Sequence, residues 1–125
     1  NIAESSWNNT STAMNHINKN IQSSDVVISG EIYTYFHTSY YNRTNKEIIL
    51  LKPKEELGWV GEWGLIKKLN TPEISSLESV KSPRIWLILR EKTYDEYKKQ
   101  VPPYWQLKQE FHDGDLIIGL YENKK

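Results

Sequence analysis

The sequence predicts an α/β domain, a small Rossmann-like three-layer sandwich whose sheet is mostly parallel and ends in an antiparallel C-terminal hairpin. Three short, nearly continuous apolar runs predict strands that are buried on both faces, as in a parallel sheet. Helical patterns or long connections separate these runs, which a parallel sheet requires because its strands are joined by crossovers. The runs cover residues 25–29, 47–51 and 84–90.

The first part of the chain alternates between helix and strand. Residues 1–11 are polar and rich in Asn, Ser and Thr, so we expect a loop or a frayed lead-in. Residues 12–22 place apolar side chains at helical spacing, which predicts an amphipathic helix before the strand at 25–29. Residues 32–41 carry both a helical and an alternating pattern, and we expect a helix because a crossover is needed here.

The segment between residues 55 and 83 has the least definite pattern. Three glycines alternate with Trp59 and Trp63, and the apolar positions from 74 to 80 predict one short helical face. A long connection of this kind is often functional, or it covers the edge of a sheet. It does not follow a predicted strand and open a helix, so it does not fit a phosphate-binding glycine loop.

The C-terminal part predicts a strand, a helix and a hairpin. After the strand at 84–90, Thr93 and Glu96 have the spacing of a capping box, which predicts the start of a helix. Paired prolines at 102–103 end it. Strands at 105–111 and 116–121 then flank a turn that contains a glycine.

Composition narrows the classes of function. Sixteen basic residues balance 16 acidic ones, so nothing favours nucleic acid or an anionic membrane surface as a partner. The chain has no cysteine, which excludes disulfides, thiolate zinc sites and a cysteine nucleophile. No run approaches the roughly 20 apolar residues of a membrane span. Because the chain starts at Asn1 without a methionine, we expect a single soluble domain, residues 1–125, excised from a larger protein.

The aromatic residues are unusual, with five Trp and eight Tyr against two Phe. Such amphipathic rings finish a small core, or they form a surface that faces carbohydrate or a partner. The glycine-flanked pair Trp59 and Trp63 predicts a contact surface, because glycine makes the backbone pliant and tryptophan is favoured at binding hot spots. In the alternative, both rings close the core beneath the loop.

Catalytic and metal-binding patterns are missing from the sequence. It contains no G-x-S-x-G elbow, P-loop or H-E-x-x-H motif. The three histidines lie in separate segments without a second ligand at a metal-binding spacing. We therefore expect no catalytic residue, no metal and no cofactor in this chain.

One candidate binding position remains, at the carboxyl end of the first predicted strand. Ligands of open α/β sheets bind outside the carboxyl ends of the strands, and Gly30-Glu31 lies there. Glu31 would have Tyr33, His37 and Arg90 as neighbours. In the alternative, Glu31 only favours the start of the following helix through the helix dipole.

Six sequence pieces follow one another in the order S-D-V-V-I at 24–28, Y-Y at 40–41, I-I-L-L at 48–51, S-P-R-I-W-L-I at 82–88, R-E-K-T-Y at 90–94 and L-Y at 120–121. Taken together, they resemble the soluble C-terminal domain of polytopic glycosyltransferases of the dolichyl-phosphate-mannose/protein mannosyltransferase type. Bacterial lipid A aminoarabinose transferases are similar. The resemblance covers roughly residues 11–121 and rests on core-strand and packing motifs.

The resemblance implies a location and a role. In that family a small α/β domain follows many transmembrane helices and lies on the extracytoplasmic face of the membrane. The enzymes transfer a sugar from a polyprenyl-phosphate donor, and their catalytic acidic residue lies in an early loop between membrane helices, outside this chain. Asp25, Tyr41 and Arg84 match the domain's pattern and look structural, as a strand start, a helix end and a strand start.

We therefore expect an accessory domain that is not catalytic alone and that binds acceptor or braces the membrane helices. Its partners would be the membrane-embedded part of the same polypeptide and a glycan or lipid-linked sugar acceptor, with no nucleic acid. The alternative is a free-standing, flavodoxin-like module that binds a small anionic ligand at the strand ends. The full gene separates the two, because the first requires many hydrophobic helices upstream of Asn1.

Overall fold

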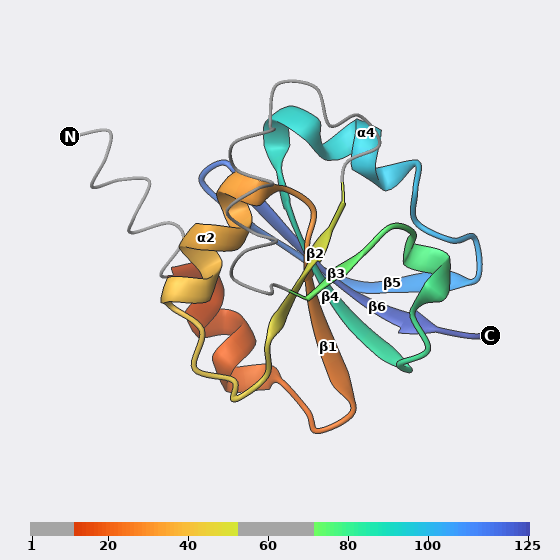
Figure 1. Cartoon of the computed structure of the whole chain (residues 1–125), viewed down its shortest axis with the longest axis horizontal. Helices are drawn as coiled ribbons and strands as arrows, with labels where there is room; N and C mark the ends of the chain where they lie inside the picture. Colours follow the sequence, from red (N-terminus) through yellow and green to blue (C-terminus); the bar gives the residue numbers. More distant parts are fainter. Residues whose placement is uncertain (1–11, 53–71) are drawn as a thin grey trace.

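A sheet of six strands runs through the middle of the computed structural model, which describes residues 12–52 and 72–125 (Figure 1). The strand order is β3-β2-β1-β4-β6-β5. The strands are β1 (Asp25–Ser29), β2 (Ile48–Leu51), β3 (Glu73–Ile74), β4 (Arg84–Arg90), β5 (Trp105–Asp113) and β6 (Leu116–Asn123). Residues 12–20 are helical, and the other described helices are α2 (Ile32–Tyr40), α4 (Tyr94–Lys98) and the 3₁₀ turns η1 (Leu77–Ser79) and η2 (Glu91–Thr93).

The three predicted core strands are parallel, as expected. β1 pairs with β2 on one side and with β4 on the other, so that Val27 lies between Ile48 and Trp86. The C-terminal strands are antiparallel, with β6 paired to β4 and β5 to β6 at the edge. The fold class predicted from the sequence is therefore confirmed.

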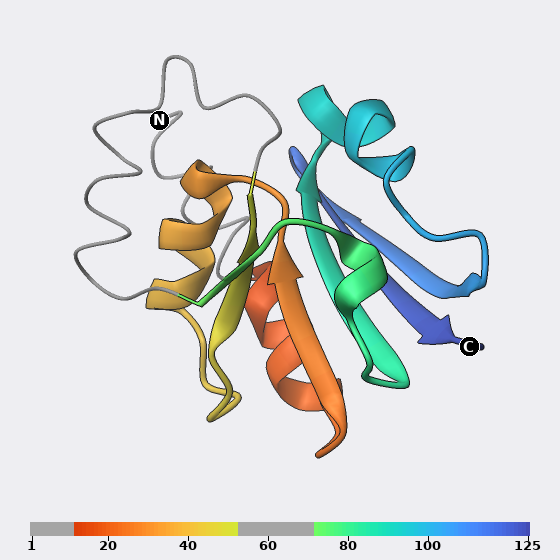
Figure 2. The ribbon, with the colours of Figure 1, turned by 45° about the vertical axis from the view of Figure 1, so that its right-hand side comes forward.

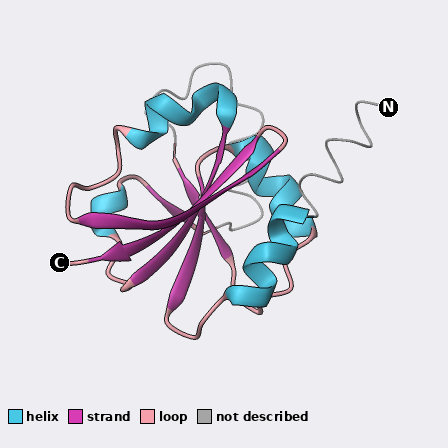
Figure 3. Cartoon of the chain, turned by 180° about the vertical axis from the view of Figure 1, so that it is seen from behind, coloured by secondary structure: helices cyan, strands magenta, loops and turns pink. Residues whose placement is uncertain are grey.

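Helices cover both faces of the sheet and make three layers (Figure 2). Helix 12–20 and α2 lie on one face, and α4 and η1 lie on the other. Figure 3 shows the strands from behind, fanned by the twist of the sheet. Because side chains alternate along a strand, each central strand contributes to both cores.

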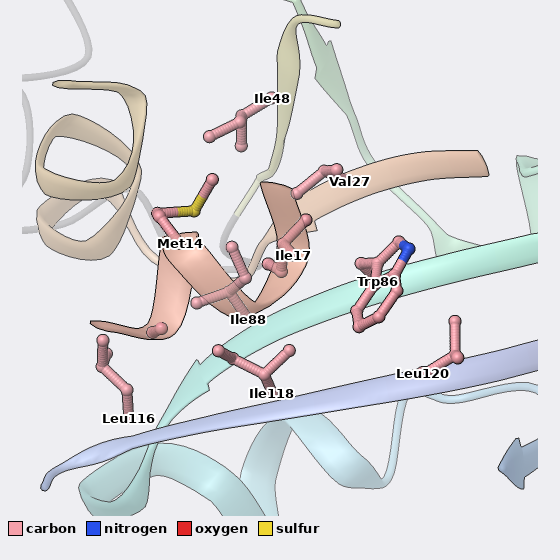
Figure 4. Close-up of a cluster of buried hydrophobic side chains, with 10 residues drawn as sticks. Met14, Ile17, Val27, Ile48, Trp86, Ile88, Leu116, Ile118 and Leu120 are labelled. Atoms are coloured by element: carbon pink, nitrogen blue, oxygen red, sulfur yellow. The ribbon is translucent and has the colours of Figure 1, made fainter. Parts of the chain in front are cut away.

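The first core lies under helix 12–20 (Figure 4). Its helix contributes Met14 and Ile17, both fully buried. The sheet side of this core consists of Val27, Ile48, Trp86, Ile88, Leu116, Ile118 and Leu120. The second core lies under α4 and η1 and is built from Ile28, Leu51, Leu77, Ile85, Leu87, Leu89, Tyr97, Trp105 and Tyr121.

A buried carboxylate joins the amino ends of β1 and β4. The side chain of Asp25 is fully buried and accepts hydrogen bonds from Arg84 Nε at 2.9 Å and from the Trp86 indole at 2.8 Å. It also accepts the backbone N–H of Gln22 at 2.9 Å. These partners satisfy both carboxylate oxygens, which makes the burial of this charge tolerable.

The structure corrects two predictions in the second half of the chain. The apolar positions from 74 to 80 do not form one helical face, because Glu73–Ile74 pairs with β2 as strand β3 and only Leu77–Ser79 is helical. Thr93 is the N-cap of α4 but makes no side-chain capping hydrogen bond. The capping box predicted from Thr93 and Glu96 is therefore wrong.

Candidate functional site

The strand order creates a topological switch point between β1 and β4. From β1 the chain continues to β2 and β3 on one side, and it returns to β4 on the opposite side of β1. In open α/β sheets, ligands bind outside the carboxyl ends of the strands at such a point. Gly30 and Glu31 follow β1 there, Arg90 is the last residue of β4, and Thr93 follows it in η2.

Gly30 is packed tightly against the neighbouring strand and helix. Its backbone N–H donates to the carbonyl of Ile88 at 3.0 Å, which continues the pairing of β1 with β4. A Cβ atom on Gly30 would lie 2.5 Å from Leu89 Cδ2 and 3.2 Å from Tyr97 Cδ1. A side chain at this position would therefore require Leu89 or Tyr97 to shift, since their side chains occupy the space beside Gly30.

Glu31 reaches across the switch point. It is the N-cap residue of α2, yet its side chain makes no capping hydrogen bond. Its carboxylate accepts a hydrogen bond from the Thr93 hydroxyl and an ion-paired one from Arg90 Nη1 at 3.5 Å, and the side chain is only 14% exposed. The carboxylate therefore bridges the end of β1 to the end of β4.

Arg90 lies between two carboxylates. Besides Glu31, its Nε lies 3.7 Å from Asp115 Oδ2. Asp115 belongs to the turn between β5 and β6, and its carbonyl accepts the backbone N–H of Glu91 at 2.7 Å. The hairpin turn is thereby attached to the same edge of the sheet as the β1–α2 turn.

Two more titratable groups border this cluster. His37 is in the last turn of α2, and partial burial lowers its pKa, while the negative charge of Asp115 acts in the opposite direction. Burial raises the pKa of Tyr97 to about 12, with the charges of Glu31 and Glu96 adding to the effect. Tyr97 thus remains a neutral phenol at physiological pH.

One expected neighbour of Glu31 is in contact with it, and two other residues of the cluster were not predicted. Arg90 contacts Glu31 as predicted. That His37 is a neighbour of Glu31 stays a prediction. Sequence patterns did not identify Thr93 and Asp115, because both had been assigned to local turns and caps. Trp59, Trp63 and the side chain of Tyr33 lie outside the part of the chain that the structure describes.

The polar side chains at the switch point form a cluster. One guanidinium, two carboxylates and one hydroxyl contact each other at the switch point. Within residues 12–52 and 72–125, no group of three or more potential ligands is placed to hold a metal ion.

The parallel core, the strand order and the switch point define a Rossmann-like α/β domain. No protein-family model matches the sequence, and no curated protein matches it either. Among solved structures, the 16S rRNA methylase RmtB is similar, with a TM-score of 0.51 and 11% identity over 96% of this chain. The chain spans 64% of the length of that methylase. At this identity the likeness concerns the fold alone.

None of the helices among the described residues has the length and apolar character needed to cross a membrane.

Proposed function

We propose that this chain is a non-catalytic, extracytoplasmic accessory domain of a membrane glycosyltransferase that uses polyprenyl-phosphate-linked sugars. The observation that carries the proposal is the contact between the two sequence pieces at the centre of the resemblance. The D-V-V-I piece forms β1 and the R-I-W-L-I piece forms most of β4, and the two pair in parallel. Asp25 of the first piece binds Arg84 and Trp86 of the second.

These contacts support a role as a scaffold. The polar residues of the two pieces hold the centre of the sheet together, at the end opposite the switch point. The side chains at the switch point also bind one another, with Glu31 held by Thr93 and Arg90. A general base or nucleophile must instead reach a substrate.

The proposed partners are the membrane-embedded part of the same polypeptide and a glycan or lipid-linked sugar acceptor. In this arrangement the domain braces the membrane helices or binds acceptor at the extracytoplasmic face of the cell membrane. We also propose that Trp59 and Trp63 form the contact surface, since glycines at 58, 61 and 64 make the backbone around them pliant and tryptophan is favoured at binding hot spots.

Sugar transfer by the isolated chain tests the non-catalytic part of the proposal. The purified 125-residue chain is incubated with a polyprenyl-phosphate-linked sugar and a peptide or lipid acceptor, and product is measured by mass spectrometry. We expect no product, because the resemblance places the catalytic carboxylate in a membrane-associated loop. Transfer by the pure chain that is lost in Glu31→Gln would overturn the proposal.

The accessory part is tested in the parent protein. The parent reading frame is expected to encode many hydrophobic helices before Asn1, and a frame without them favours the anion-binding alternative. In the full-length enzyme, Trp59→Ala and Trp63→Ala are expected to reduce transfer while changing the stability of the isolated domain by only about 0.5 kcal/mol. Lys108→Ala, in the exposed strand β5, is the matched control. A loss of about 3–5 kcal/mol would place both rings in the core instead.

A further inference from the structure

We propose that Glu31 is a built-in occupant of the anion position at the switch point, and that it keeps small anions such as phosphate away from the groups that hold it. The proposal rests on where the carboxylate lies. It makes no capping hydrogen bond to its own helix and contacts Thr93 and Arg90 on the other side of the switch point.

The groups that hold Glu31 are those that an external anion would use. A guanidinium and a hydroxyl are common donors to phosphate oxygens, and both converge on the Glu31 carboxylate. α2 begins at Ile32, so the partial positive charge of its first turn also lies beside this position. A bound anion and the Glu31 carboxylate would therefore compete for the same donors.

Side chains also fill the space beside the backbone of Gly30, independently of charge. In a nucleotide-binding turn, a glycine lets the ligand approach the backbone. Here the side chains of Leu89 and Tyr97 stand where a Cβ of Gly30 would be, at 2.5 Å and 3.2 Å. The glycine therefore admits the protein's own side chains, and the donors around Glu31 are the groups beside this turn that a small anion could bind.

The Glu31 carboxylate should weaken the binding of an external anion by competition. An external anion binds only in the fraction of molecules whose carboxylate has left its donors, so its apparent dissociation constant is the intrinsic value divided by that fraction. Removing the carboxylate removes this penalty. We expect Glu31→Ala to bind inorganic phosphate at least about tenfold more tightly than the wild-type chain.

The test is a phosphate titration followed by amide NMR spectra, with sodium chloride at matched ionic strength as the reference. In the wild-type chain, the Gly30 and Thr93 amides are expected to shift no more with phosphate than with chloride. In Glu31→Ala the same amides are expected to shift saturably. If the alanine variant does not fold, Glu31→Gln replaces it, since it removes the charge but keeps the volume.

Asp115→Asn is the matched control, because it removes the other carboxylate beside Arg90 and leaves Glu31 in place. It is expected to behave like the wild-type chain. The proposal is overturned if the wild-type amides saturate with phosphate, if Asp115→Asn gains as much as Glu31→Ala, or if a folded Glu31 variant gains nothing. This outcome is independent of the accessory role, which is tested by sugar transfer.

Discussion

Single residues at the two ends of β1 have different tasks. At the amino end, Asp25 collects hydrogen bonds from Arg84, Trp86 and Gln22 and is fully buried. At the carboxyl end, Glu31 is partly exposed and makes contacts that an external anion could also make. The first carboxylate is therefore structural, whereas the second lies where open α/β folds bind ligands.

Replacing Asp25 with Asn should strongly destabilise the domain. The change removes the charge opposite Arg84 and leaves fewer acceptors for the buried indole N–H of Trp86. Breaking such a buried pair costs about 3 kcal/mol or more. Urea unfolding followed by tryptophan fluorescence measures the difference.

The control for Asp25 is a surface pair. Lys52 Nζ and Glu73 Oε1 are 4.0 Å apart, and the two side chains are 27% and 30% exposed. Glu73→Gln should therefore cost less than about 1 kcal/mol. If Asp25→Asn were no more destabilising than Glu73→Gln, the buried contacts of Asp25 would contribute no more to the free energy of unfolding than a surface ion pair does.

His37 should make stability depend on pH. Burial lowers its pKa below the ordinary value of 6.5 in the folded state, although Asp115 acts to raise it. As pH falls, the unfolded chain therefore binds a proton at His37 before the folded chain does, and the free energy of unfolding decreases between pH 6.5 and the lower pKa of the folded state. Above pH 6.5 the stabilisation from neutral His37 is fully present.

NMR titration of the His37 ring and unfolding curves across this range check the prediction. The midpoint should lie below 6.5 in the wild-type chain and lower still in Asp115→Asn, because that variant loses the charge that raises the pKa. In His37→Gln the loss of stability below pH 6.5 should be smaller. A higher midpoint in Asp115→Asn would show that Asp115 does not act on His37.

Among the elements, those with a strong apolar pattern were predicted best. Residues 25–29 and 84–90 form the predicted strands, and the helix predicted at 32–41 is α2. The continuous apolar runs made the parallel strands recognisable, because both faces of such strands are buried. β3 was missed since a strand of two residues has no periodicity to detect.

The candidate site was less predictable than the fold. Glu31 and Arg90 could be placed together because Glu31 follows β1 and Arg90 ends β4, and these parallel strands end at one edge of the sheet. The sequence pattern of Thr93 suggested a helix cap, but its hydroxyl donates to Glu31 instead. Such competition between a local and a distant partner is decided by tertiary packing, which local spacing does not describe.

The contact of the β1–α2 turn with β4 should make Gly30 and Leu89 energetically coupled. Gly30→Ala places a methyl group 2.5 Å from Leu89 Cδ2, and this overpacking should cost about 1–3 kcal/mol. In Gly30→Ala/Leu89→Ala the clash is relieved, so the double variant should be more stable than the sum of the single changes predicts.

A double-mutant cycle by chemical denaturation measures this coupling. Gly30→Ala combined with Leu87→Ala is the control, because Leu87 is a buried leucine on the same face of β4 but is not among the atoms nearest Gly30. The control pair should be additive within about 0.5 kcal/mol. Equal additivity of both pairs would mean that Gly30 does not rest against Leu89.

At the scale of the whole molecule, the sheet depends on strands from opposite ends of the chain. Helix 12–20 packs on a core to which β6 contributes Leu116, Ile118 and Leu120. The antiparallel hairpin was predicted from its turn, and Gly114, with a φ of 60°, adopts the backbone that such a turn requires. The order of the strands was not predicted, because it depends on these distant contacts.

Removing the hairpin should therefore abolish cooperative folding. A chain that ends at Pro103 lacks β5 and β6, which uncovers the edge of β4 and removes the three β6 side chains from the core around Trp86 and Ile88. Their loss exceeds what a domain of marginal stability tolerates, because each buried aliphatic side chain contributes about 2–5 kcal/mol.

A chain that ends at Asn123 is the control, since it lacks only the exposed Lys124 and Lys125 and retains every strand. Thermal unfolding followed by near- and far-ultraviolet circular dichroism should show one cooperative transition for the control and none for the shorter chain. Coincident cooperative transitions in the shorter chain would show that the four parallel strands and their helices fold without the hairpin.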